Sequence, residues 1–96
     1  MQTFKHSKAI KAYLEGLKTW TSIGFVPTMG ALHKGHTALI DRSVRENDLT
    51  ICSIFVNPLQ FNRIEDLDSY PDRMQADCEM LIEHHCDILF NPRKED

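Results

Sequence analysis

The chain has 96 residues, of which 42% are hydrophobic and 26% charged, and its formal net charge is −3. These values are ordinary for one small globular domain or for part of a larger one, and they exclude a disordered, collagen-like or disulfide-dense chain. No apolar run approaches the roughly 20 residues that cross a bilayer, and the first residues lack the apolar segment of a signal peptide. Lys and Arg are scattered among the acids, so we expect a cytoplasmic protein whose partners include neither nucleic acid nor a membrane.

The three cysteines, Cys52, Cys78 and Cys86, are odd in number and have no C-x-x-C spacing. Reduced thiols in a reducing compartment are the simplest interpretation. A zinc site formed by Cys78, Cys86 and the His84–His85 pair is the alternative. We predict no metal site in the chain.

Helical and extended patterns alternate along the sequence. Apolar residues at helical spacing predict helices over about residues 7–20, 35–47 and 72–85. Short apolar or β-branched runs predict strands over 23–26, 49–56 and 87–90, with Pro27 ending the first of them. This alternation implies right-handed crossovers, so we expect an α/β fold with a parallel sheet of three strands. The carboxyl ends of parallel strands lie together, which should bring residues 27–30 and 57–61 into one site.

The first candidate site segment follows the strand predicted at 23–26 and leads into a helix. It reads Met29-Gly30-Ala31-Leu32-His33-Lys34-Gly35-His36. A helix N-terminus suits an anion, and Gly30 and Gly35 allow close approach of the backbone and angles closed to other residues. His33 and His36 can point the same way if the helix begins between them, and can then donate hydrogen bonds to polyphosphate oxygens. The alternatives are that both histidines only cap or pack the loop, or that they bind a metal, for which no third ligand stands at a useful spacing.

The second candidate segment, Asn57-Pro58-Leu59-Gln60-Phe61, follows the strand predicted at 49–56. Pro58 should end that strand and hold the Asn57 and Gln60 amides at the carboxyl end of the sheet. An amide donates and accepts, so Gln60 could bind a substrate that carries hydroxyl and carboxylate groups; the alternative is a satisfied turn amide. The sequence has no P-loop, dinucleotide fingerprint or G-x-S-x-G elbow, which removes support for kinase-like, dehydrogenase and hydrolase functions.

These segments resemble the pantothenate synthetase (pantoate–β-alanine ligase) family. The similarity is carried by residues 26–36 and 53–61, and continues in Glu65-Asp66-Leu67, Tyr70-Pro71, Asp77 and residues 87–92. The His-x-Gly-His motif alone marks only the wider nucleotidyltransferase superfamily. Its combination with Asn-Pro-Leu-Gln-Phe is far more specific.

The resemblance implies a Rossmann-like parallel sheet and a reaction in two steps. The pantoate carboxylate attacks the α-phosphate of ATP, giving pantoyl adenylate and pyrophosphate, and β-alanine then releases AMP and pantothenate. The residues implied to bind ATP are Met29, Gly30, Ala31, Leu32, His33, Lys34, Gly35 and His36.

Within that set the resemblance implies individual roles. His36 would be the proton donor, and His33 would assist at the phosphates. Gln60 and Met29 would bind pantoate and β-alanine, and Mg²⁺ would accompany the nucleotide. Lys34 stands where the family usually has an acid. We expect it to face solvent, and the alternative is that this extra cation contacts a phosphate.

The family enzyme is much longer than this chain. We therefore expect residues 1–96 to be the N-terminal part of a nucleotide-binding Rossmann-like domain, without its remainder and a C-terminal lid, and the active enzyme to be a homo-oligomer, a dimer. In the sheet, the third predicted strand should lie beside the second, and the second beside the first. Residues 23–26 then form an edge strand without the charged residues that protect such edges. We therefore expect the chain to self-associate and to bind ATP weakly. The alternatives are a nucleotide-binding module without turnover, or another His-x-Gly-His adenylyl- or cytidylyltransferase.

Overall fold

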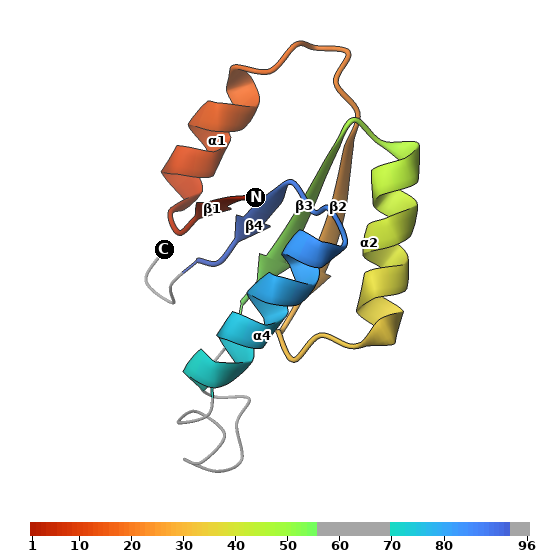
Figure 1. Cartoon of the computed structure of the whole chain (residues 1–96). Helices are drawn as coiled ribbons and strands as arrows, with labels where there is room; N and C mark the ends of the chain where they lie inside the picture. Colours follow the sequence, from red (N-terminus) through yellow and green to blue (C-terminus); the bar gives the residue numbers. More distant parts are fainter. Residues whose placement is uncertain (56–69, 93–96) are drawn as a thin grey trace.

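The computed structural model describes residues 1–55 and 70–92, and these form one parallel sheet with helices on both faces (Figure 1). The strands are β1 (Gln2–Phe4), β2 (Ile23–Thr28), β3 (Leu49–Ile54) and β4 (Ile88–Phe90), in the order β1-β4-β3-β2. The helices are α1 (Ser7–Glu15), α2 (Lys34–Glu46) and α4 (Tyr70–Glu83). The predicted α/β class, the parallel pairing and the order of the three predicted strands are confirmed.

The prediction of three strands was incomplete, because β1 adds a fourth at the edge next to β4. Three residues are too few to show a period, and β1 is held by pairing with residues 88–90, at the other end of the described chain. β2 also runs one residue beyond Pro27, which was predicted to end it. A proline is tolerated in a strand at a sheet edge, where its missing N–H is not needed by a neighbour, and β2 is such a strand.

The helix boundaries differ from the predicted ones chiefly in α1, which ends at Glu15 rather than near residue 20. Gly16 caps it, and the Gly16 N–H donates to the carbonyl of Tyr13 at 3.1 Å. The residues after it turn without continuing the helix, so the apolar Leu17 belongs to the connection to β2. α2 and α4 lie within two residues of their predicted bounds.

Two apolar clusters hold the layers together, one on each face of the sheet. On one face, strand side chains such as Cys52 and Ile54 pack with Ile40 of α2 and Leu81 of α4. On the other, Ile51 and Ile88 pack with Ile10 of α1. β3 is buried on both faces, as its nearly continuous apolar sequence predicts.

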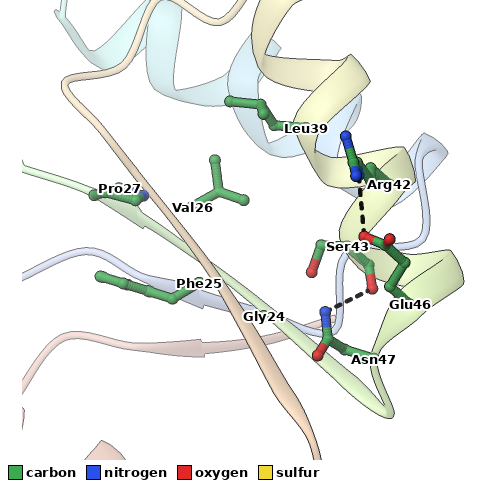
Figure 2. A pocket seen from close by; sticks show the side chains of 9 residues that line it. All are labelled: Gly24, Phe25, Val26, Pro27, Leu39, Arg42, Ser43, Glu46 and Asn47. Atoms are coloured by element: carbon green, nitrogen blue, oxygen red, sulfur yellow. Dashed lines mark hydrogen bonds and ion pairs between the residues drawn. The ribbon is translucent and has the colours of Figure 1, made fainter.

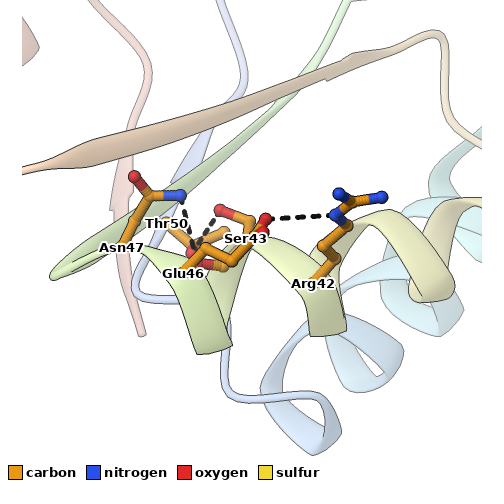
Figure 3. Close-up of polar contacts among 5 residues, drawn as sticks. All are labelled: Arg42, Ser43, Glu46, Asn47 and Thr50. Atoms are coloured by element: carbon orange, nitrogen blue, oxygen red, sulfur yellow. Dashed lines mark hydrogen bonds and ion pairs between the residues drawn. The ribbon is translucent and has the colours of Figure 1, made fainter.

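α2 lies against β2 at very short range, because the strand carries Gly24 at the crossing. A Cβ built on Gly24 would overlap Ser43 Oγ and would approach Asn47 Nδ2 to 2.7 Å. The same end of α2 carries a polar cluster, in which Ser43 Oγ and Thr50 Oγ1 are 2.7 Å apart and Asn47 Nδ2 donates to the Ser43 carbonyl at 3.2 Å (Figure 3). This packing fixes α2, and with it the connection that enters its N-terminus.

Candidate active site

The connection between β2 and α2 begins at the carboxyl end of the sheet, where its first residues are tied to the neighbouring strand. Thr28 Oγ1 donates to the Ser53 carbonyl at 2.9 Å and accepts the Gly30 N–H at 3.2 Å. Gly30 and Ala31 follow with φ of 88° and 53°, both in the left-handed region. Glycine reaches that region freely, whereas the Cβ of alanine makes it unfavourable. The predicted freedom of Gly30 is confirmed, and the second unusual angle falls on Ala31 rather than on Gly35.

His33 and His36 form a reciprocal cap at the start of α2. His33 is the N-cap residue, and its Nδ1 accepts the Gly35 N–H at 3.0 Å. His36 Nδ1 accepts the His33 N–H at 3.1 Å. The two rings lie with their centroids 4.1 Å apart. The helix therefore begins between the two histidines, and the predicted approach of both side chains is confirmed.

This cap fixes the protonation of both imidazoles. A neutral imidazole has one acceptor nitrogen and one N–H, and here Nδ1 is the acceptor in each ring, so the proton is on Nε2. Burial lowers the pKa of His36 from its ordinary value, the neighbouring His33 lowers it further, and Asp77 opposes the shift. At neutral pH, His36 is therefore an uncharged donor at Nε2. The expectation that the histidines cap the loop and the expectation that they donate to a ligand are compatible, because each uses a different nitrogen.

Gly35 and Lys34 complete the motif. A Cβ on Gly35 would lie 2.8 Å from His33 Cε1, so this glycine makes room for the capping imidazole rather than for an unusual backbone angle. Lys34 is exposed, as predicted. Met29, which is 63% exposed, stands at the opening of the same connection.

Asp77 of α4 is the polar residue of this region to which the sequence had assigned no role. It is 3% exposed and accepts two backbone N–H groups, from Ala31 at 2.9 Å and from Leu32 at 2.8 Å. A signal was present in the sequence, because Asp77 lies three residues after Met74 and four before Leu81 on the apolar side of the helix. An acid at such a position requires a polar partner within the protein.

The predicted second segment cannot be placed beside the first. Asn57, Gln60 and Phe61 lie outside the described residues, as do Glu65 to Leu67. The role of Gln60 stays a prediction. Among residues 1–55 and 70–92, no three His, Cys, Asp or Glu side chains gather to hold a metal ion, and no helix is long and apolar enough to span a bilayer.

A groove of about 450 Å³ lies elsewhere, along the edge strand and the last turns of α2 (Figure 2). Its walls include Phe25, Leu39, Arg42 and Glu46, and it contains no residue of the 29–36 connection. The donors that the sequence predicts for phosphate lie instead at the N-terminus of α2. Backbone amides there lie beside two imidazole Nε2–H donors, an arrangement suited to phosphate oxygens.

Comparison with known proteins identifies the family of the chain. The family model for pantoate-beta-alanine ligase matches residues 2–96. The crystal structure of pantoate-beta-alanine ligase from Francisella tularensis, complexed with beta-gamma ATP and beta-alanine, is 45% identical with a TM-score of 0.84. The alignment covers 100% of this chain and 37% of the Francisella tularensis chain. Pantothenate synthetase from Thermus thermophilus is 43% identical with a TM-score of 0.76, over 99% of this chain and 33% of its own. The chain thus spans about a third of the length of these relatives, and it belongs to the pantoate–β-alanine ligase family.

Proposed function

We propose that the chain forms the first part of the ATP site of an enzyme that joins pantoate to β-alanine. The observation that carries the proposal is the reciprocal cap of His33 and His36, which leaves an Nε2–H on each ring beside the amides of a helix N-terminus. The relative from Francisella tularensis, complexed with beta-gamma ATP and beta-alanine, supports the choice of ligands.

In the proposed first step the pantoate carboxylate attacks the α-phosphorus of ATP, the bond to the β-phosphate oxygen breaks, and pyrophosphate leaves. Negative charge grows on the phosphate oxygens as that bond lengthens. His36, neutral because its pKa is lowered, donates a hydrogen bond from Nε2 to these oxygens, and His33 does the same beside it. Residues 29–36 hold the nucleotide, and within them the side chain of Lys34, the exposed first residue of α2, faces solvent.

In the proposed second step the β-alanine amine attacks the acyl carbon of pantoyl adenylate, and AMP leaves with the formation of pantothenate. Met29 and Gln60 are the residues of this chain that we assign to pantoate and β-alanine. An amide that both donates and accepts suits a substrate with hydroxyl and carboxylate groups. The assignment of Met29 is supported by its exposed position at the start of the 29–36 connection.

We assign Mg²⁺ to the phosphates of ATP, which it accompanies in phosphate chemistry generally. The chain would be the N-terminal part of a Rossmann-like nucleotide domain, and its cytoplasmic location and dimeric assembly stay predictions. A second candidate is a module that binds the nucleotide without turnover. This candidate is favoured because the chain spans only about a third of the length of its relatives.

The proposal is tested by comparing this chain with the same chain completed by the remainder of the Francisella tularensis ligase. With ATP and pantoate alone, the completed protein should form pyrophosphate in an amount equal to the enzyme present. Addition of β-alanine should then release AMP continuously. Pyrophosphate formed with CTP, or with other acids in place of pantoate, would point instead to another nucleotidyltransferase activity. ATP binding by the completed protein without release of pyrophosphate or AMP would identify the binding module.

A further inference from the structure

Asp77 reaches the candidate site from a distant part of the sequence. It belongs to α4, which packs on the same face of the sheet as α2, while its partners belong to the β2–α2 connection (Figure 1). Its carboxylate lies 45 residues from Leu32 along the chain and is 3% exposed. The carboxylate is therefore shielded from water, and its partners are the two backbone N–H groups that it meets there.

The two hydrogen bonds of Asp77 need a carboxylate. Oδ2 accepts the Ala31 N–H and Oδ1 accepts the Leu32 N–H, so each oxygen serves one donor. An amide of the same size has one acceptor oxygen and one NH₂ group, which is itself a donor. Asparagine at this position would therefore satisfy one backbone N–H and direct a donor at the other.

The bonds act on the strained part of the connection. Ala31 has a φ of 53°, which is unfavourable for a residue with a Cβ, and Gly30 before it has a φ of 88°. Leu32, the second partner, is buried in the core beside α4. His33 follows directly, and its own N–H must point at His36 Nδ1 for the reciprocal cap to form.

From this chain of contacts we propose that Asp77 is a positioning residue, which holds residues 31 and 32 so that His33 and His36 present their Nε2–H groups to the phosphates of ATP. The inference rests on the proposed function of residues 29–36 in binding ATP. Asp77 itself would touch no substrate, since it is 3% exposed and both of its side-chain oxygens bond to the backbone. Its effect on ATP would pass through the two histidines.

The test replaces Asp77 by Asn and uses Asp87→Asn as the matched control. Asp87 also accepts one backbone N–H, from Thr50 at 2.8 Å, and the amide oxygen of Asn can keep that bond. NMR of the ¹⁵N-histidine-labelled chain reports which ring nitrogen carries the proton, and a titration with MgATP reports affinity. Asp77→Asn should mix the two tautomers at His36 and weaken ATP binding about 10- to 100-fold. Asp87→Asn should change neither.

A rescue separates positioning from general stabilisation. Ala31→Gly removes the Cβ that makes the left-handed angle unfavourable. The double variant Ala31→Gly with Asp77→Asn should therefore bind ATP several-fold more tightly than Asp77→Asn alone. A loss of stability elsewhere in the fold would not respond to this change. If Asp77→Asn does not fold, a backbone ester in place of the Ala31 amide, introduced by chemical ligation, removes one N–H and leaves Asp77 intact. It should show the same mixing of tautomers.

The outcomes distinguish this inference from the proposed function. A folded Asp77→Asn chain with unchanged histidine tautomers and unchanged ATP affinity overturns the positioning role and leaves the proposed function standing. If the unmodified chain does not bind MgATP, the proposed function fails for the chain, and the tautomers alone decide the inference. Mixed tautomers would then support it, and unchanged ones would overturn it.

Discussion

His36 Nδ1 accepts the backbone N–H of His33 at 3.1 Å, so the conformation of one motif histidine sets the protonation of the other. The bond exists only while Nδ1 of His36 carries no proton. The same bond therefore stabilises the start of α2 and keeps the proton of His36 on Nε2, where it can be donated to a ligand. Two histidines separated by a lysine and a glycine therefore serve both purposes.

This coupling predicts a pH dependence of stability with a definite sign. Burial and the nearby His33 lower the pKa of His36 from its ordinary 6.5, so between the two values the unfolded chain binds more protons than the folded one. The contribution of His36 to stability is therefore fully present above pH 6.5 and decreases as the pH falls below it. Denaturant unfolding from about pH 8 to about pH 5 measures the effect.

The control for this measurement is His36→Gln, because glutamine at this position of a capping box also accepts the N-cap N–H and does not titrate. The pH dependence of the wild-type chain should exceed that of His36→Gln over the same range. Identical pH dependences for the two proteins would show that folding does not lower the pKa of His36.

For turnover, we predict that His36→Ala in the completed protein slows formation of pantoyl adenylate by two to three decades, about 3–4 kcal/mol, because it removes a donor that acts mainly in the transition state. Pyrophosphate release in a single turnover measures this rate. His6→Ala is the matched control, since His6 is the N-cap residue of another helix, α1, and lies outside the 29–36 connection. An unchanged rate in His36→Ala would assign the catalytic donor to another residue.

The sequence predicted the parts of the fold that depend on local pattern. Apolar spacing placed α2 and α4 within two residues of their ends, and the apolar run of β3 indicated burial on both faces. β1 could not be found in this way, because a three-residue strand is defined by its pairing with β4 and not by its own period. Pro27 was misjudged for a similar reason, since its place in a strand depends on β2 being at an edge.

In the candidate site, too, the sequence predicted the local features but not the contacts between distant residues. The motif His33-Lys34-Gly35-His36 predicted a helix that begins between two neighbouring imidazoles, because three-residue spacing is a local property. The bonds from Asp77 to Ala31 and Leu32 span 46 and 45 residues, and no local pattern reports them. Only the presence of an acid on an apolar helix face hinted at a buried partner.

The packing of α2 on β2 predicts a sharp difference between two glycines. Gly24→Ala should destabilise the chain by about 1–3 kcal/mol, because the new Cβ would overlap Ser43 Oγ and force the helix away from the strand. Gly16→Ala should stay within about 0.5 kcal/mol, since its Cβ would meet only backbone oxygens at 3.5 and 3.8 Å. Urea unfolding of both variants makes the comparison. Equal stabilities would mean that the close contact at Gly24 does not exist in solution.

The exposed edge of the sheet predicts self-association. β2 carries Ile23 and Phe25, which are 41% and 58% exposed, and the strand itself contains no charged residue. Light scattering at micromolar concentrations should find species larger than a monomer, and Phe25→Lys should shift them toward the monomer. Ile82→Lys, at an equally exposed position on α4, is the control and should not. A monomer in the unmodified chain would show that this edge does not mediate association.

Binding of ATP by the Nε2–H groups of His33 and His36 can be observed by histidine ¹⁵N NMR of the chain during a titration with MgATP. The signals of His33 and His36 should report a proton on Nε2 before ATP is added, and both should shift together as the nucleotide binds. His6, His84 and His85, which lie outside the 29–36 connection, should stay in place. Shifts confined to these three, or a proton on Nδ1 of His36 in the free chain at neutral pH, would contradict the role of the two motif histidines.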